Sequence, residues 1–214
     1  DTLRRVGSWD FPVHIHIVEG DEDGKLHEEK YGCSAFERLQ RYHICKANSL
    51  LVHGIRLSHK DIDEIAGTAC RVAFNPQSNQ NNGAGLPAYA RFKARGIPVL
   101  LGNDGFGYDF SRDVRSLLIT QHHVTQSPLG FSLDDLFQVV FRNNAEYASA
   151  LLGERVGVIE EGAAEMNAQK FAESRDALAA SFRFNASVDS VTVSARMLTE
   201  NRSRAADLLR LALT

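Results

Sequence analysis

Short apolar segments alternate with amphipathic segments along most of the chain. In the segment 11–18, Val13, Ile15 and Ile17 recur at every second position, which is the period of a β-strand. Apolar residues at three- and four-residue spacing then predict a helix over 34–42. The alternation continues and predicts strands over 49–53, 71–75 and 97–101, with helices over 58–66, 86–95, 111–126 and 132–152.

Polar side chains stand where these predicted strands end. The connections are long enough to hold a helix, so the pattern predicts an α/β fold of parallel βα units. In such folds the reactive side chains gather at the carboxyl ends of the strands. The residues in this position are His16 with Glu19, then His53, Asn75 and Asp104. We therefore expect a functional site at this edge of the sheet.

The sequence changes in character after Gly153. We expect a boundary there, with one part over 1–153 and a C-terminal extension over 154–214. The elements predicted for the extension are a helix over 160–180, a β-hairpin over 188–202 and a closing helix over 203–213.

Composition narrows the class of protein. The 214 residues carry 24 Lys and Arg against 27 Asp and Glu, a net charge of −3 that is unsuited to neutralising phosphates, so we expect no nucleic-acid partner. No apolar run approaches 18 residues, so no membrane span is expected. The 3 cysteines are odd in number and form no Cys-x-x-Cys pair. That usage suits a reducing, cytoplasmic location and structural cysteines.

Each candidate residue has an ordinary interpretation beside the chemical one. His16 and Glu19 could bind a metal and move a proton, or they could be a strand-end histidine and part of a solvated acidic loop over 19–23. His14 is predicted to be packed or hydrogen-bonded. Asp104 lies in an Asn-Asp-Gly sequence, which is also common in plain turns.

A polar segment over 75–83 follows the third predicted strand. We expect it to be a loop, either a solvated connection or a source of hydrogen bonds to a substrate. The candidate substrate-binding residues are Asn75, Ser78, Asn79 and Asn82.

These motifs together resemble a known family. His-x-x-Glu, then His, then Asn-Pro-x-Ser-Asn, then Gly-x-Asp-Gly follow successive strands, as in the second half of an amidohydrolase-superfamily barrel. The chain looks most like the guanine deaminase and chlorohydrolase group. The segments 75–82 and 104–107 and the Asn143-Asn144-Ala145 sequence are similar to SsnA-like aminohydrolases. The resemblance runs from about 12 to 162.

The resemblance implies a metal-dependent hydrolase that acts on C–N bonds other than peptide bonds. The barrel of the family holds one divalent metal, usually zinc, with iron as an alternative. His16 and Asp104 would be metal ligands, and Asp104 would also take a proton from the bound water. Glu19 would protonate the ring nitrogen of the substrate, and His53 would orient the attacking hydroxide. The implied reaction is hydrolytic deamination of a heterocyclic amine, a small-molecule substrate.

The resemblance also implies that part of the site is missing. A (β/α)8 barrel typically needs about 250 residues, and only four of its strands are predicted here. The family's His-x-His metal-ligand pair is absent, because His14 and His16 belong to the later His-x-x-Glu motif. The extension would be a helix and hairpin remnant of the family's small β-sandwich domain. We therefore expect a fragment or a split-barrel subunit that binds metal weakly and is inactive alone.

Two other interpretations stay open at this point. The chain could be a non-catalytic half-barrel that assembles with the missing half or into a homo-oligomer through its open sheet edges. It could also be a small-molecule binding module that has kept the polar strand ends and lost the chemistry.

Overall fold

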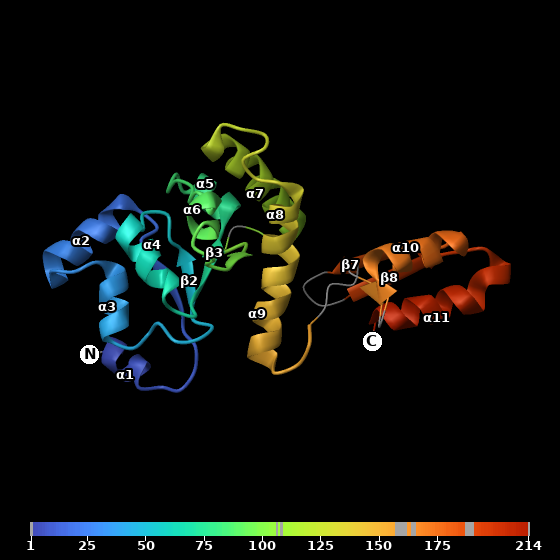
Figure 1. The fold of residues 1–214 in the computed structure, drawn as a ribbon, viewed down its shortest axis with the longest axis horizontal. Helices are drawn as coiled ribbons and strands as arrows, with labels where there is room; N and C mark the ends of the chain where they lie inside the picture. Colours follow the sequence, from blue (N-terminus) through green and yellow to red (C-terminus); the bar gives the residue numbers. More distant parts are fainter. Residues whose placement is uncertain are drawn as a thin grey trace. The chain divides into compact units, whose positions relative to one another are not determined.

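A computed structural model describes residues 2–105, 107, 109–156, 162–163, 166–186 and 191–213. The chain divides into two compact units, Asp1–Arg155 and Val156–Thr214, which are described separately below (Figure 1). Among the described residues, no helix combines the length and the apolar character that crossing a membrane requires.

The first unit is built on a parallel sheet of four strands, as the sequence predicted. The strands pair in the order in which they occur in the chain, and Ile17 lies opposite His53 while Phe74 lies opposite Leu101. This register brings all four carboxyl ends to one edge of the sheet (Figure 1). The strands are β1 (His14–Ile17), β2 (Leu50–His53), β3 (Arg71–Phe74) and β4 (Val99–Leu101).

Helices connect and follow these strands. They are α1 (Thr2–Gly7), α2 (Asp21–Tyr31), α3 (Ala35–Arg41), α4 (His59–Ala66), α5 (Pro76–Asn81), α6 (Tyr89–Lys93), α7 (Phe110–Thr125), α8 (Leu133–Phe137), a π-helical turn η1 (Gln138–Arg142) and α9 (Asn143–Leu152). The helix predicted over 132–152 is therefore interrupted by the π-helical turn.

Two segments predicted as loops are helical. The acidic loop over 19–23 contains the start of α2, because the Gly20 amide donates to Asp23 and three acidic residues lie at the positive end of the helix dipole. The segment over 75–83 contains α5, which begins with Pro76 at its first position. Proline is favourable there because its missing N–H has no partner in a helix anyway.

The sheet buries apolar side chains on both faces, as parallel sheets do. One face packs with the helices into the main core, which includes Leu51, Val72 and Val99. Successive side chains of a strand point to opposite faces, so their neighbours form a second, smaller cluster on the other face. That cluster consists of Leu50, Val52, Ala73 and Leu100, with Tyr147 of α9 packed against it.

Two asparagines of α9 occupy the free edge of β4. Asn143 Nδ2 donates to the Val99 carbonyl at 2.7 Å. Asn144 Nδ2 donates to the Leu101 carbonyl at 3.0 Å, and its Oδ1 accepts from the Leu101 amide at 3.2 Å. These side chains take the place of a neighbouring strand, so they satisfy backbone groups that an edge strand otherwise leaves unpaired.

The second unit contains short hairpins and two helices. The elements are β5 (Gly162–Ala163), β6 (Met166–Asn167), α10 (Ala168–Ala177), β7 (Ser181–Ala186), β8 (Val191–Arg196), a 3₁₀ turn η3 (Thr199–Asn201) and α11 (Arg202–Leu213). A small core joins α10 to α11 through Phe171, Leu178, Ala205 and Leu208.

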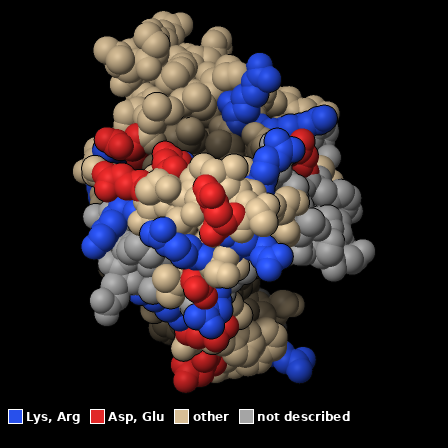
Figure 2. All heavy atoms as spheres, turned by 90° about the vertical axis from the view of Figure 1, so that its right-hand side faces the viewer, with Lys and Arg blue, Asp and Glu red and all other residues tan. Residues whose placement is uncertain are grey.

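The predictions for the second unit were partly wrong. The predicted closing helix is confirmed as α11, but the first helix begins only at Ala168. The hairpin predicted over 188–202 is formed by β7 and β8, because the alternating pattern already begins at Ser181 and ends at Arg196. On the face drawn in Figure 2, Lys and Arg side chains are interspersed with Asp and Glu side chains.

Candidate active site

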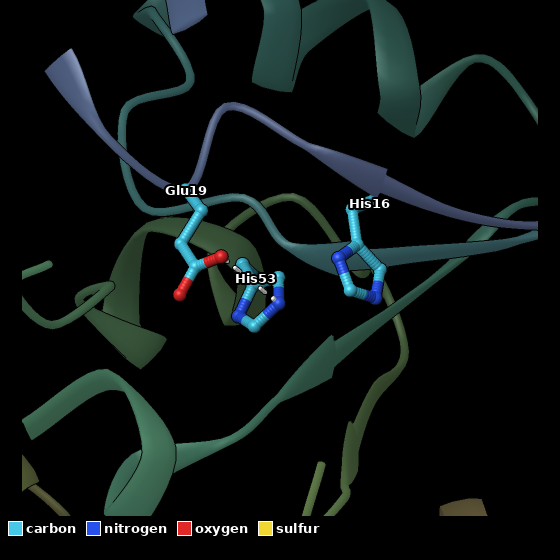
Figure 3. Close-up of side chains that lie close together, drawn as sticks. All are labelled: His16, Glu19 and His53. Atoms are coloured by element: carbon cyan, nitrogen blue, oxygen red, sulfur yellow. Dashed lines mark ion pairs between the residues drawn. The ribbon is translucent and has the colours of Figure 1, made fainter. Parts of the chain in front are cut away.

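His16 and Glu19 come from the end of β1 and the turn that follows it. His16 is exposed on this edge strand, and Glu19 lies two residues beyond the strand end. Val18, which lies between them, has a left-handed φ of 38°. That conformation is unusual for a β-branched residue and turns the chain sharply after the strand. The Glu19 carboxylate consequently faces the end of the neighbouring strand (Figure 3).

His53 ends β2 and is fully buried. Its φ is 70°, and Gly54 follows with a φ of 60°, so two consecutive residues are left-handed. Such a conformation costs free energy in a residue other than glycine and persists only where the surroundings impose it. A side chain at position 54 would also place a Cβ 2.9 Å from Leu57 Cδ1. The turn after β2 is therefore built to hold the His53 ring inside the protein.

These three side chains converge on a small region (Figure 3). One ligand atom from each of His16, Glu19 and His53 lies within 4.8 Å of the others. His53 Nε2 lies 3.5 Å from Glu19 Oε2 and 3.8 Å from Asp104 Oδ2. The His16 and His53 rings meet edge to face, with 4.8 Å between their centroids. Two imidazoles and two carboxylates from three strand ends thus form one cluster.

Asp104 follows β4 and is held by two donors. Ser78 Oγ donates to its Oδ2 at 2.7 Å, and the Gly105 amide donates to its Oδ1 at 2.7 Å. The Ser78 hydrogen bond is the largest cause that lowers the pKa of Asp104, followed by the Gly105 amide and the nearby histidines His53 and His16. The carboxylate is therefore ionised at neutral pH and can attract a cation or accept a proton.

Helix α5 supplies the contacts that hold the cluster. Ser78 binds Asp104, and the next residue, Asn79, places its Oδ1 2.8 Å from His53 Nδ1. Both side chains are buried. Asn82 is exposed, and its Nδ2 lies 3.5 Å from Ser78 Oγ. Of the four residues predicted to bind substrate, two therefore contact the reacting groups themselves.

A cavity of about 420 Å³ opens beside the cluster. Its polar end holds His16, Asn75 and Asp104, and the apolar wall comes from the second face of the sheet. Gly102 lets Asn75 reach this end, because a Cβ at position 102 would lie 2.4 Å from Asn75 Oδ1. The cavity gives a small molecule room next to the four titratable side chains.

Some cavity residues were missed or misjudged from the sequence. His14 was expected to be packed, but it is exposed and lines the cavity, where partial burial and the nearby histidines His16 and His53 lower its pKa. Tyr147 and Asn144 reach the cavity from α9. The Asn143-Asn144 sequence was noticed, but no pattern within the helix showed which strand it would meet.

Residues 3–197 match the family model described as "Amidohydrolase family". The chain belongs to the amidohydrolase family. The superfamily resemblance inferred from the four motifs is thereby confirmed.

Named deaminases are among the relatives of this amidohydrolase-family chain. A 5-methylthioadenosine/S-adenosylhomocysteine deaminase of Pyrococcus abyssi is 30% identical over 170 residues, which are 76% of this chain and 39% of the relative. An adenosine deaminase from Xanthomonas campestris with bound zinc superposes with a TM-score of 0.63 at 20% identity, covering 68% of this chain and 35% of that one. For E. coli guanine deaminase the TM-score is 0.60 at 19% identity, with 67% and 35% covered.

The likeness extends through the first unit and defines its fold. Together with the parallel sheet, it identifies an α/β, TIM-like barrel fold of which this chain contains a part. The chain spans about two-fifths of the length of its Pyrococcus abyssi relative.

Proposed function

We propose that this chain provides part of the active site of a metal-dependent hydrolase that deaminates a heterocyclic amine. The observation that carries the proposal is the convergence of His16, Glu19 and His53 within 4.8 Å, with Asp104 Oδ2 3.8 Å from His53 Nε2. The names of the relatives support deamination as the reaction. A small nitrogen heterocycle with an amino group is therefore the proposed substrate class.

The donor set fits a divalent metal. Imidazole nitrogens and carboxylate oxygens are ligands that zinc accepts, and imidazole also suits iron. His53 Nε2 is buried without a hydrogen-bond partner, which is unusual for a buried polar atom and indicates an absent binding partner nearby. We assign His16 and Asp104 as metal ligands. A bound metal of this kind would lower the pKa of a water from about 15.7 to about 7, which supplies hydroxide at neutral pH.

The remaining groups divide the proton transfers. His53 Nε2 faces the space between Glu19 and Asp104 and would orient the attacking water. Asp104 is ionised and would accept the proton from that water. Glu19 is partly exposed and would donate a proton to the ring nitrogen, where negative charge develops during attack at the C–NH₂ carbon. Asp104 would then pass its proton to the leaving amino group while the new hydroxyl returns a proton to Glu19, so that ammonia leaves, a C=O bond forms and one water is consumed overall.

The ligand set of this chain is short of what a catalytic zinc uses. Three protein ligands and a water are usual, whereas His16 and Asp104 supply two. We propose that further ligands come from a segment outside this chain or from a partner chain. The chain alone is then expected to bind zinc weakly and to release no ammonia from its substrate.

Zinc binding tests the ligand assignment directly. The chain is titrated with zinc in competition with a chromophoric chelator, beside the variants His16→Ala and Asp104→Asn. Each variant should weaken binding, because each removes one of two proposed ligands. The matched control His123→Ala removes an exposed histidine of α7 and should change nothing. Equal binding by all four proteins would show that the ligands have been assigned wrongly.

A chimera tests the reaction. This chain is joined to the part of the Pyrococcus abyssi relative that it does not match, and ammonia release from amino-purine nucleosides is measured. Activity that is present in the chimera and abolished by Asp104→Asn would support the proposal. Activity that survives Asp104→Asn would contradict the role given to this carboxylate.

A further inference from the structure

Asn79 is held in a fixed position beside His53. It is fully buried on α5, and its backbone is tied at both ends: its amide donates to the Asn75 carbonyl at 2.9 Å, and its carbonyl accepts from the Ala84 amide at 3.0 Å. Its Oδ1 lies 2.8 Å from His53 Nδ1. A carboxamide oxygen can only accept a hydrogen bond, so the His53 nitrogen that faces it must donate.

The second imidazole nitrogen lies near two carboxylates without forming a hydrogen bond to either of them. His53 Nε2 is buried and has no hydrogen-bond partner. The nearest carboxylate oxygens, from Glu19 and Asp104, lie at 3.5 Å and 3.8 Å, which is beyond a normal N–H···O length of about 2.7–3.2 Å. The tautomer is therefore assigned from the short Nδ1 contact with Asn79 Oδ1, which places the proton on Nδ1 and leaves the lone pair on Nε2.

We propose that Asn79 is a positioning residue that holds His53 as the Nδ1–H tautomer and so directs the Nε2 lone pair between Glu19 and Asp104. The catalytic use of this lone pair rests on the proposed function, in which it accepts a hydrogen bond from the attacking water. The tautomer itself rests on the orientation of the Asn79 carboxamide, whose Oδ1 faces His53 Nδ1 and whose Nδ2 is buried without a hydrogen-bond partner. Asn79 was expected to contact substrate, and this proposal gives its buried side chain a different task.

The neighbouring residue strengthens this interpretation of α5. Ser78 donates to Asp104 Oδ2 at 2.7 Å, so two consecutive side chains of one helical turn orient two reacting groups from different strands. The His53 backbone is left-handed, so the strand end by itself does not hold the ring in an ordinary strand geometry. The hydrogen bond from α5 supplies the missing restraint.

Nuclear magnetic resonance can read the tautomer without any enzymatic activity. Long-range ¹H–¹⁵N correlation spectra of the histidine rings are recorded for the metal-free chain at an alkaline pH at which the ring ¹⁵N shifts show neutral imidazoles. The His53 signals are identified by their loss in His53→Gln. His53 should show a protonated Nδ1 and an unprotonated Nε2. His122 is the internal control with the opposite tautomer, because its Nε2 must donate to the Phe131 carbonyl at 3.0 Å.

Variants of Asn79 separate a positioning role from a merely structural one. Asn79→Ala removes the acceptor, and His53 should change to the Nε2–H tautomer, whose proton can turn toward Glu19 and Asp104. Asn79→Asp keeps an acceptor in place and should preserve the Nδ1–H tautomer. If Asn79→Ala does not fold, the wild-type spectrum and Asn79→Asp still decide the question.

Two results would overturn the proposal: an Nε2–H tautomer in the wild-type chain, or an unchanged tautomer in folded Asn79→Ala. Both are independent of the zinc titration. If the wild-type chain lacks the Nδ1–H tautomer of His53 but still binds zinc through His16, only the role of Asn79 is refuted. The expected tautomer with no zinc binding would refute only the proposed function.

Discussion

The hydrogen bond from Ser78 to Asp104 makes a quantitative prediction. Hydrogen bonds to charged groups contribute about 1.5–3 kcal/mol. Asp104 has a side chain that is 27% exposed, and its other oxygen keeps the Gly105 amide, so the low end applies. Ser78→Ala should therefore lower the free energy of unfolding at pH 7 by about 1.5 kcal/mol. The same change should raise the pKa of Asp104, because the Ser78 hydrogen bond is the largest cause that lowers it.

The sign of the pH dependence follows from the direction of the shift. The pKa of Asp104 is lowered in the folded protein, so its stabilisation is present above the unfolded value of about 3.9 and is lost as the pH falls through the folded pKa. The gap in stability between wild type and Ser78→Ala should be full at pH 7 and close below about pH 4. This gap in stability is measured by denaturant unfolding. The signal is the fluorescence of Trp9, which is the single tryptophan of the sequence and lies in the first unit.

A neutral hydrogen bond provides the control. Ser116 accepts from the Gln80 carboxamide, and neither group titrates near these pH values. Ser116→Ala should therefore cost the same stability at pH 7 and below about pH 4. If the loss in Ser78→Ala persists at low pH, or if the carboxyl pKa of Asp104 does not rise, this account of the site's electrostatics is wrong.

Three further substitutions test other parts of the structure. Asn144→Ala should lower the free energy of unfolding by about 1–3 kcal/mol, because it leaves the N–H and C=O of Leu101 unpaired at the sheet edge. Denaturant unfolding measures this loss, and light scattering measures the self-association that an open edge permits. Unchanged stability would refute the edge contact. Burial raises the pKa of Asp113 more than its hydrogen bonds with Gln77 lower it, so its ionisation lowers stability as the pH rises through the folded pKa. Asp113→Asn should raise the denaturant midpoint of unfolding above that of wild type at pH 7, and the two midpoints should become equal near pH 4. A lower midpoint for the variant at pH 7 would contradict the argument. Gly102→Ala should destabilise the first unit by about 1–3 kcal/mol, because the added Cβ displaces the Asn75 side chain from the cavity. A crystal structure of the variant with Asn75 in its original position would refute this prediction.

The four strands and the position of the site were predictable from local pattern. A parallel strand that is buried on both faces has a short apolar run in the sequence. The polar residue that ends this run can be recognised without knowing which strands lie beside it. His16, His53 and Asp104 were identified in this way, and they do converge. Their convergence was predictable because consecutive parallel strands bring the same ends to one edge.

The helices α2 and α5 were not predictable in the same way. Their segments contain acidic residues, glycine or asparagines that also favour turns, and these residues have weak intrinsic preferences for a helix. Contacts made at the helix ends decide such cases. In α5, Ser78 Oγ donates to Asp104 and Asn79 Oδ1 lies against His53 Nδ1, and the partner is 26 residues away in each case.

The sequence by itself determined the order of strands, the candidate reacting residues and the family to which they belong. These depend on periodicity and on motifs, which are properties of short segments. Only the tertiary structure decided which groups these residues contact. Ser78 and Asn79 contact the side chains of other candidate residues, and His14 lines a cavity. Asn143 and Asn144 pair the free edge of a strand. The physical reason is that a hydrogen bond depends on distance and direction between groups far apart in the chain, which no local pattern specifies.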